Sequence, residues 1–91
     1  MALIEFYGAE CPHCLAMKPR VEQLEKEEGV TIEQFEVWHN AENQEKMRSY
    51  AEVLAPACGG DLGVPAFINT DTKDALCGEV TYETLKTWAK K

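Results

Sequence analysis

Residues 2–14 carry the stretch that decides the fold, which reads ALIEFYGAECPHC. Its first six residues are apolar except for Glu5, and such a run before a glycine predicts a strand that is buried on both faces. Cys11 and Pro12 then open a predicted helix to about Glu28, because proline fits the first helical turn, where its missing N–H has no partner to lose. A buried strand followed by a cysteine pair at a helix N-terminus indicates dithiol redox chemistry.

The chain after the cysteine pair predicts a long helix and a second strand. Pro19 lies inside the helix and should kink it, and Gly29 should end it. The residues expected on its apolar face are Leu15, Val21 and Leu24. Residues 30–38 predict the second strand, and because their apolar positions change phase once, we expect either a bulge or burial on both faces.

A second helix and a hairpin are predicted further along the chain. Asn40 is the expected N-cap of a helix over residues 41–54, followed by a Gly- and Pro-containing loop over residues 55–63. The residues of this helix that should face inward are Met47, Tyr50, Ala51 and Leu54. Strands over residues 66–69 and 75–77 are joined by a short turn and should therefore pair antiparallel.

The last helix is predicted from its N-cap Thr81 to Lys91, with Leu85 and Trp88 facing inward. The full order is strand–helix–strand–helix–strand–strand–helix. It predicts an α/β fold in which a four-stranded mixed sheet is flanked by three helices on its two faces. The first two strands should be parallel and joined by a right-handed crossover. A chain of 91 residues fits a single domain, residues 1–91.

Composition and charge argue against several classes of function. The formal net charge is −7 and the isoelectric point about 4.7, whereas nucleic acid and anionic membrane surfaces require clustered Lys and Arg. No apolar run is long enough for a membrane span, and no signal-peptide pattern is visible, so a cytoplasmic protein is expected. In that setting a close cysteine pair indicates a catalytic or metal-binding role more than a structural one.

The Cys-Pro-His-Cys motif has the spacing that dithiol chemistry needs. Residues i and i+3 of a helix lie on one face roughly 5–6 Å apart, which matches the Cα separation of a disulfide. Cys11 and Cys14 are therefore predicted to form a redox-active disulfide. A helix N-terminus lowers a thiol pKa, so Cys11, at the N-cap, is the expected nucleophile. Cys14, one turn inside the helix, is the expected resolving thiol.

Three neighbouring residues are expected to influence this centre. His13 should stabilise the Cys11 thiolate by a hydrogen bond or a positive charge, which makes a disulfide more oxidising; the alternative is an exposed histidine without effect. Glu10 opposes His13 through its negative charge. Glu5 interrupts the apolar strand, so burial would raise its pKa and let it accept the proton of Cys14; the alternative is a carboxylate on a partly solvated face.

A Cys-x-x-Cys motif is also half of a zinc site. A structural zinc ion takes four protein ligands, and the residues available to complete such a set are Cys58, Cys77 and His39. No second Cys-x-x-Cys motif exists in the chain. We therefore expect no metal and no bound cofactor other than the redox-active disulfide itself.

Residues 3–14 resemble the active-site segment of the thioredoxin superfamily. The resemblance extends over residues 2–91 and is to the short form of the fold, which lacks an extra N-terminal strand and helix. It implies, in order, a buried acid, a helix-kinking proline, a cis-proline facing the redox centre and a last-strand glycine bordering the substrate groove, at Glu5, Pro19, Pro65 and Gly78. It also implies that the backbone of Val64 pairs with a substrate strand beside the cysteines.

The resemblance implies a thiol–disulfide oxidoreductase, here a protein disulfide reductase that cycles a Cys11–Cys14 disulfide through a mixed disulfide with its substrate. The Pro12-His13 pair between the cysteines is similar to that of the bacterial periplasmic dithiol oxidase, which implies a more oxidising disulfide. The direction of electron flow therefore stays open. One alternative is a glutaredoxin-like, glutathione-dependent reductase, although Glu10 and the Cys77-Gly78-Glu79 turn depart from that pattern. Another is a metal- or iron–sulfur-binding module. The expected partners of a monomeric protein are disulfide-containing proteins or small thiols and an upstream reductase or oxidant.

Cys58 and Cys77 lie outside the core motif of this family, in segments that the implied fold brings near the redox centre. Three interpretations compete for this possible second thiol pair. The leading one is a pair of buried free thiols that act as small apolar residues. The others are a second disulfide that restrains the loop before Pro65, and a pair that relays electrons or binds metal.

Overall fold

The computed structural model describes residues 3–90, which form a mixed α/β structure. Its strands are β1 (Leu3–Tyr7), β2 (Ile32–Glu36), β3 (Ala66–Asn69) and β4 (Asp74–Cys77). They form one sheet in the order β2-β1-β3-β4, with β1 and β2 parallel and the other pairs antiparallel. The predicted four-stranded mixed sheet is confirmed. The expected extensions to Ala2 and Lys91 lie outside the described residues.

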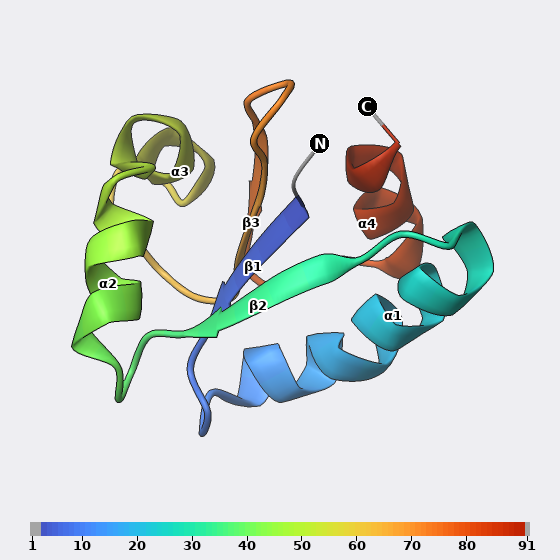
Figure 1. The fold of residues 1–91 in the computed structure, drawn as a ribbon, viewed down its shortest axis with the longest axis horizontal. Helices are drawn as coiled ribbons and strands as arrows, with labels where there is room; N and C mark the ends of the chain where they lie inside the picture. The colour runs from blue at the N-terminus through green and yellow to red at the C-terminus, as the bar shows by residue number, and fades with distance from the viewer. Residues whose placement is uncertain (1–2, 91) are drawn as a thin grey trace.

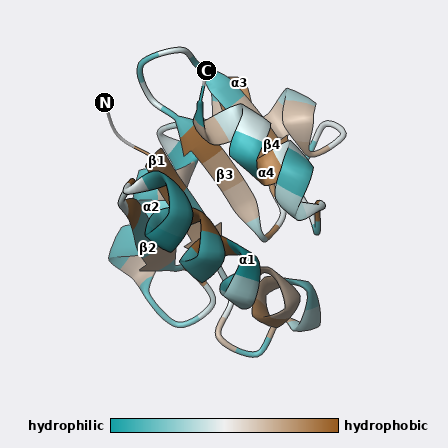
Figure 2. Ribbon diagram, turned by 90° about the vertical axis from the view of Figure 1, so that its right-hand side faces the viewer, coloured by the Kyte–Doolittle hydropathy of each residue, from teal (hydrophilic) through white to brown (hydrophobic). Residues whose placement is uncertain are grey.

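Four helices cover this sheet in the described part of the chain. They are α1 (Pro12–Glu28), α2 (Ala41–Arg48), α3 (Ala51–Ala57) and α4 (Tyr82–Ala89). Figure 1 shows α1 and α4 on one side of the sheet and α2 and α3 on the other, so the sheet is the middle of three layers. In Figure 2 hydrophobic colour runs along β3, whereas α2 and α4 carry long hydrophilic stretches. Over residues 3–90, no helix is long and apolar enough to cross a membrane.

The helix predicted over residues 41–54 is in fact two helices, so the expected count of three is wrong. The break lies at Ser49, whose hydroxyl donates a hydrogen bond to the Lys46 carbonyl and so competes with continuation of the helix. The loop predicted from Ala55 is also wrong at its start, because α3 continues to Ala57 in spite of Pro56. The N–H groups of Cys58 and Gly60 both bond to the Ala55 carbonyl and so complete this last turn.

Three of the predicted helix ends are confirmed, whereas α4 ends at Ala89, short of the predicted end at Lys91. The Asn40 side chain accepts a hydrogen bond from the Asn43 N–H at 3.0 Å, and Thr81 accepts one from the Thr84 N–H at 3.2 Å. Gly29 ends α1 in the left-handed conformation with φ of 67°, which glycine adopts at little steric cost. These local signals therefore specify where α1 ends and where α2 and α4 begin.

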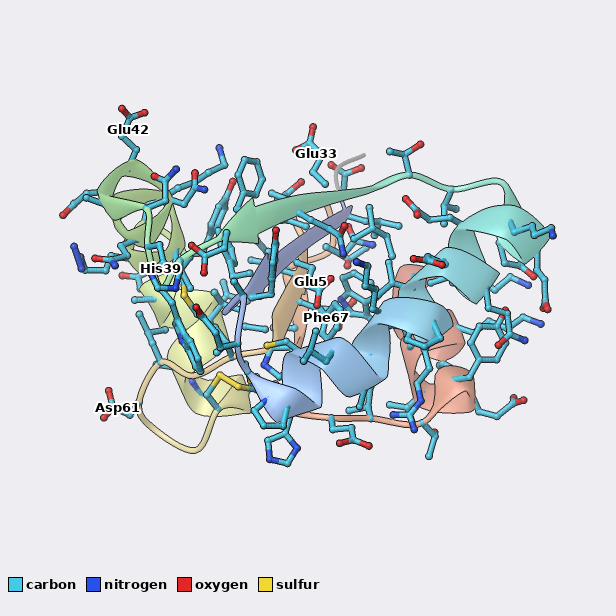
Figure 3. All side chains as sticks on the ribbon, turned by 90° about the horizontal axis from the view of Figure 1, so that it is seen from below. Glu5, Glu33, His39, Glu42, Asp61 and Phe67 are labelled. Atoms are coloured by element: carbon cyan, nitrogen blue, oxygen red, sulfur yellow. A yellow bond between two sulfur atoms is a disulfide. The ribbon has the colours of Figure 1, made fainter. Side chains whose placement is uncertain are left out.

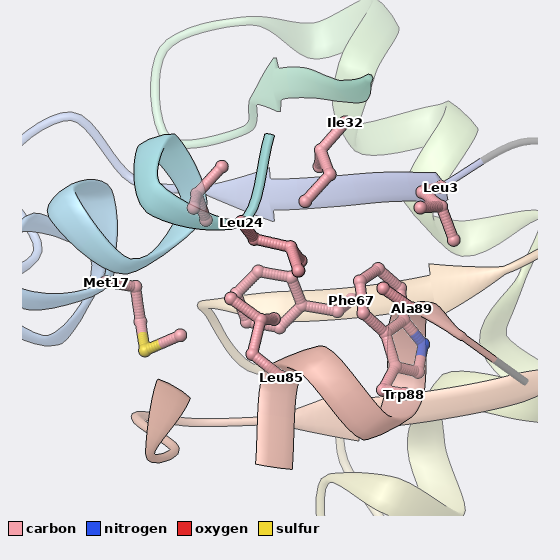
Figure 4. Packing of buried hydrophobic residues seen from close by; sticks show 9 residues of the cluster. Leu3, Met17, Leu24, Ile32, Phe67, Leu85, Trp88 and Ala89 are labelled. Carbon is pink, nitrogen blue, oxygen red and sulfur yellow. The ribbon is translucent and has the colours of Figure 1, made fainter. Parts of the chain in front are cut away.

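One hydrophobic core lies between the sheet and the helices α1 and α4. It contains Leu3, Met17, Val21, Leu24, Ile32, Phe67, Leu85, Trp88 and Ala89. Figure 4 shows Phe67 and Trp88 at its centre, where their rings meet edge to face with centroids 5.5 Å apart. Leu15 is not part of it: its side chain is 57% exposed, because the buried stripe of α1 instead passes through Cys14 and Met17.

A second core lies between the sheet and the helices α2 and α3. It contains Ile4, Phe6, Val37, Met47, Leu54, Ala66 and Ile68. The strand β1 therefore contributes to both cores, as its apolar sequence predicts. The strand β2 is shorter than expected and pairs with β1 without interruption from Ile32 to Glu36. Ile32 packs into the first core and Phe35 against the second, so burial on both faces, not a bulge, explains the change of phase.

Two leucine-to-alanine substitutions at different positions of α1 test this assignment of the buried stripe. Leu24→Ala should lower the free energy of unfolding by about 2–5 kcal/mol, because the Leu24 side chain is completely buried and its loss leaves a cavity. Leu15→Ala should change it by no more than about 0.5 kcal/mol, since that side chain is mostly in solvent. Urea unfolding followed by circular dichroism measures both, and equal losses would show that the stripe is misassigned.

Candidate dithiol site

The two cysteines of the motif lie where β1 gives way to α1. Cys11 is the N-cap of α1, and its backbone N–H donates to the Gly8 carbonyl at 3.1 Å. The Gly8 N–H in turn points at the sulfur of Cys14, with N and Sγ 3.5 Å apart. The turn after β1 therefore holds the first turn of α1 against the end of the strand.

Cys14 is a shielded thiol. Its residue is only 5% exposed, and burial raises the pKa of Cys14 to about 12. The hydrogen bond from Gly8 acts in the opposite direction, and the neighbouring Cys11 thiol and Glu5 carboxyl raise this pKa further. A thiol of this kind stays protonated at neutral pH, which suits a resolving role more than an initial attack.

Cys11 is also a free thiol, and its neighbours come from a distant part of the chain. Its Sγ lies 3.9 Å from the backbone carbonyl oxygen of Val64, to which the thiol donates. The Val64–Pro65 peptide bond is cis, as the resemblance implies. The Pro65 carbonyl accepts a 2.7 Å hydrogen bond from the N–H of Gly78. The structure thus brings Cys11, Val64, Pro65 and Gly78 to one end of the sheet.

Gly78 differs from its expected place in one respect. It follows β4, which ends at Cys77, and is not a residue of the last strand. Its φ of 87° lies in the region that favours glycine, so the chain turns here immediately after its hydrogen bond to Pro65. A side chain at this position would strain the turn that borders the Cys11 site.

Glu5 is buried, so the alternative of a partly solvated carboxylate is wrong. It is 2% exposed, and Figure 3 shows it in the interior, whereas the labelled Glu33, Glu42 and Asp61 lie at the periphery. Burial raises the pKa of Glu5 above its ordinary value of 4.5, although a 2.8 Å hydrogen bond donated by Gln34 partly offsets this. Glu5, Gln34 and Cys14 border one pocket of about 270 Å³, whose other lining residues are Tyr7, Gly8, Ala9, Leu15 and Lys18.

His13 bonds to Glu79 across the site. Its Nδ1 lies 3.1 Å from Glu79 Oε1, and its side chain is 68% exposed. Arg20 holds the other Glu79 oxygen at 3.3 Å and donates to the Val80 carbonyl at 2.9 Å. The hydrogen bond from His13, together with Arg20, lowers the pKa of Glu79. The His13–Glu79 hydrogen bond thus joins α1 to the loop after β4.

Glu10 is likewise paired. Its carboxylate lies 2.7 Å from Nε2 of His39, and this hydrogen bond raises the pKa of His39. Glu36 accepts hydrogen bonds from the backbone N–H groups of Ala9 and His39, which joins the turn after β1 to the segment after β2. The negative charge expected to oppose His13 is therefore directed toward a different histidine.

Cys58 and Cys77 form a disulfide, so the leading interpretation of two free thiols is wrong. The sulfurs are 2.05 Å apart and the Cα atoms 5.0 Å apart. The bond joins the C-cap of α3 to the last residue of β4 because the antiparallel hairpin returns the chain beside α3. Both cysteines are thus unavailable as thiolate ligands, and His39 faces Glu10. Within residues 3–90, no cluster of three or more His, Cys, Asp or Glu side chains has the arrangement of a metal site.

Three residues of the site could not be assigned from sequence patterns. Gln34 reaches Glu5 because the two residues are opposite each other in the parallel β1–β2 register, which the sequence does not specify. Arg20 and Glu79 meet although 59 residues separate them. The one available signal was local: Glu79 directly follows Gly78, a residue already expected beside the site.

No family model matches the chain, and no curated protein matches it at a significant level.

The buried carboxyl of Glu5 predicts a pH-dependent stability. Because the pKa of Glu5 is raised in the folded state, its contribution is fully present below about pH 4.5 and is lost as the pH rises through the folded pKa. Glu5→Gln removes this titration, so the stability of the variant relative to the wild type should rise as the pH increases above about 4.5. Urea unfolding at each pH measures the difference. The exposed Glu33→Gln serves as the control, and a Glu5→Gln difference that is independent of pH would contradict the assignment.

The His13–Glu79 pair predicts a change in redox equilibrium. Glu79→Gln removes a negative charge that borders the motif and frees the His13 ring from the Glu79 carboxylate, so the Cys11 thiolate should be better stabilised. At about pH 6 the equilibrium constant for oxidation of glutathione should then rise about threefold, equivalent to about 14 mV. The rise should shrink in a His13→Asn background, and Glu42→Gln on α2 is the matched charge control. An equal rise with and without His13 would show that the pair does not act as a unit.

Proposed function

We propose that this protein is a thiol–disulfide oxidoreductase of the thioredoxin superfamily, acting as a protein disulfide reductase. One observation carries the proposal: two free thiols occupy the first turn of α1 in chemically different surroundings. Both cysteines are 5% exposed, but their neighbours differ: Cys11 is the N-cap of α1 and its thiol faces the Val64 carbonyl. Cys14 lies inside α1, its sulfur accepts from the Gly8 N–H, and its pKa is raised to about 12. Dithiol exchange needs this asymmetry, because one sulfur must attack first and the other must wait.

In the proposed reaction, the Cys11 thiolate attacks one sulfur of a client disulfide. A Cys11–client disulfide forms, and the other client sulfur leaves as a thiolate that takes up a proton. Cys14 then loses its proton, attacks Cys11 and releases the second client sulfur. The client gains two electrons and two protons, and the protein is left with a Cys11–Cys14 disulfide. The same steps in reverse oxidise a client dithiol, and a separate dithiol reductant restores the starting state.

Glu5 is the proposed acceptor for the proton of Cys14. The two groups border the same pocket, and the negative charge of Glu5 contributes to the raised pKa of Cys14. Because burial also raises the pKa of Glu5, this carboxylate is a stronger base than an exposed one. The pKa of Glu5 is thus closer to that of the Cys14 thiol than an exposed carboxylate's would be, which favours proton transfer. Gln34 keeps the carboxyl in place through its 2.8 Å hydrogen bond.

The groups around Cys11 favour a polypeptide client over glutathione. The Val64 backbone lies 3.9 Å from the Cys11 sulfur, where an extended client segment can pair with main-chain groups. Glutathione is an anionic tripeptide and would need a cationic site. The motif is instead flanked by the carboxylates of Glu10 and Glu79, and the histidines that contact them are already paired with these carboxylates. A glutaredoxin-like activity is accordingly the weaker alternative.

Two single variants test the proposal. Cys14→Ser should accumulate a covalent mixed disulfide with insulin, because Cys11 still attacks but nothing resolves the adduct. Cys11→Ser should form no adduct and should not accelerate insulin reduction by dithiothreitol. Mass spectrometry identifies the adduct, and turbidity follows insulin reduction. Acceleration by Cys11→Ser equal to that of the wild type would refute the assigned roles.

A further inference from the structure

We propose that the Cys58–Cys77 disulfide is a positioning element for protein clients, because it holds the segment carrying Val64 opposite Cys11. This inference rests on the proposed function and adds a determinant of substrate class. The disulfide would favour polypeptide substrates, which need Val64, over small dithiols and disulfides, which need only the Cys11–Cys14 pair.

The first observation is where the disulfide attaches. Cys58 caps α3, Cys77 ends β4, and the segment of residues 59–65 runs between α3 and β3 beside them. The Gly63 carbonyl oxygen lies 4.0 Å from the Cys58 sulfur and 3.8 Å from the Cys77 sulfur. The middle of the segment therefore rests directly against the disulfide.

The second observation is how close this support is to the reacting sulfur. Gly63 precedes Val64, whose carbonyl oxygen accepts from the Cys11 thiol at 3.9 Å. On the other side of the same segment, the Pro65 carbonyl is held at 2.7 Å by Gly78, the residue after Cys77. Cys77 and its neighbour thus support the residues on both sides of Val64.

The third observation is the composition of the segment itself. Gly59 and Gly60 have φ of 85° and 111°, a region that glycine adopts at little steric cost. Because glycine has the most backbone freedom of any residue, this part of the segment would sample many conformations without a restraint. Asp61 is exposed, while Leu62 and Val64 are partly buried and pack against the second core. The disulfide and the hydrogen bond of Gly78 add to this packing and restrain the residues on either side of Val64.

A preorganised main-chain partner reduces the ordering that a client must undergo on binding. If the disulfide is removed, Val64 must be ordered by the client itself, so the concentration needed for half-saturation rises. The exchange step should change little, since Glu5 lies on β1, Cys14 on α1 and Cys11 at the N-cap of α1, all outside residues 59–65. A small dithiol that does not contact Val64 should react at an unchanged rate.

The test uses each protein with its Cys11–Cys14 pair oxidised to a disulfide, as an oxidant of thiols; in the wild type the Cys58–Cys77 disulfide is present as well. The wild type and Cys58→Ala/Cys77→Ala are each mixed with reduced, unfolded ribonuclease and separately with dithiothreitol. In either reaction the substrate dithiol is oxidised to a disulfide, and Cys11–Cys14 gains two electrons and two protons. Alkylation and mass spectrometry follow the Cys11–Cys14 pair with time.

For the double variant, the concentration of reduced ribonuclease that gives half-saturation should be at least about five times that of the wild type. The limiting rate should stay within about twofold of the wild type. Its rate constant with dithiothreitol should also stay within about twofold. A second variant, with two glycines inserted after Gly60, keeps all four cysteines and should show the same split. An unchanged half-saturation concentration, or an equal loss with dithiothreitol, would overturn this inference. A wild type that oxidises neither substrate would instead overturn the proposed function.

Discussion

The turn at Gly8 is the constraint on which the candidate site depends. Its N–H points at the Cys14 sulfur and its carbonyl accepts from the Cys11 N–H, so one residue contacts both cysteines. A Cβ atom at this position would collide with the ring of Trp38, which covers the glycine. Because β1 is an interior strand with both faces buried, the position of this turn is set by the two cores. The N-terminus of α1 follows from it.

The charges near the motif are arranged in local pairs, which the formal net charge of −7 does not reveal. Glu10 faces His39, Glu79 faces His13 and Arg20, and the buried Glu5 bonds to Gln34. Within residues 3–90, every buried side-chain nitrogen and oxygen has a hydrogen-bond partner. Burial of Glu5 therefore leaves its carboxyl with a hydrogen-bond partner, and burial raises the pKa of both Glu5 and Cys14.

The sequence was informative where structure is determined by near neighbours. The strand before the motif, the helix opened by Pro12 and the Gly29 cap are local signals, and all three are confirmed. The break after Arg48 depends on a hydroxyl–carbonyl bond of Ser49 that no periodicity reports, so two helices were predicted as one. Two further shortfalls have a common cause. The Cys58–Cys77 disulfide was only an alternative to two free thiols because the bond spans 19 residues, and Gln34 was missed because its place depends on strand register, so both require the assembled sheet.

The central claim is that Cys11 and Cys14 form one reversible two-electron couple. It is tested most directly by equilibrating the protein over a series of glutathione redox buffers and quantifying the Cys11–Cys14 disulfide by alkylation and peptide mass spectrometry. The account predicts a single reversible transition that follows a two-electron Nernst curve, about 30 mV per tenfold change in the ratio of oxidised to reduced forms. If Cys11 and Cys14 form only separate mixed disulfides with glutathione and never bond to each other, the claim is contradicted.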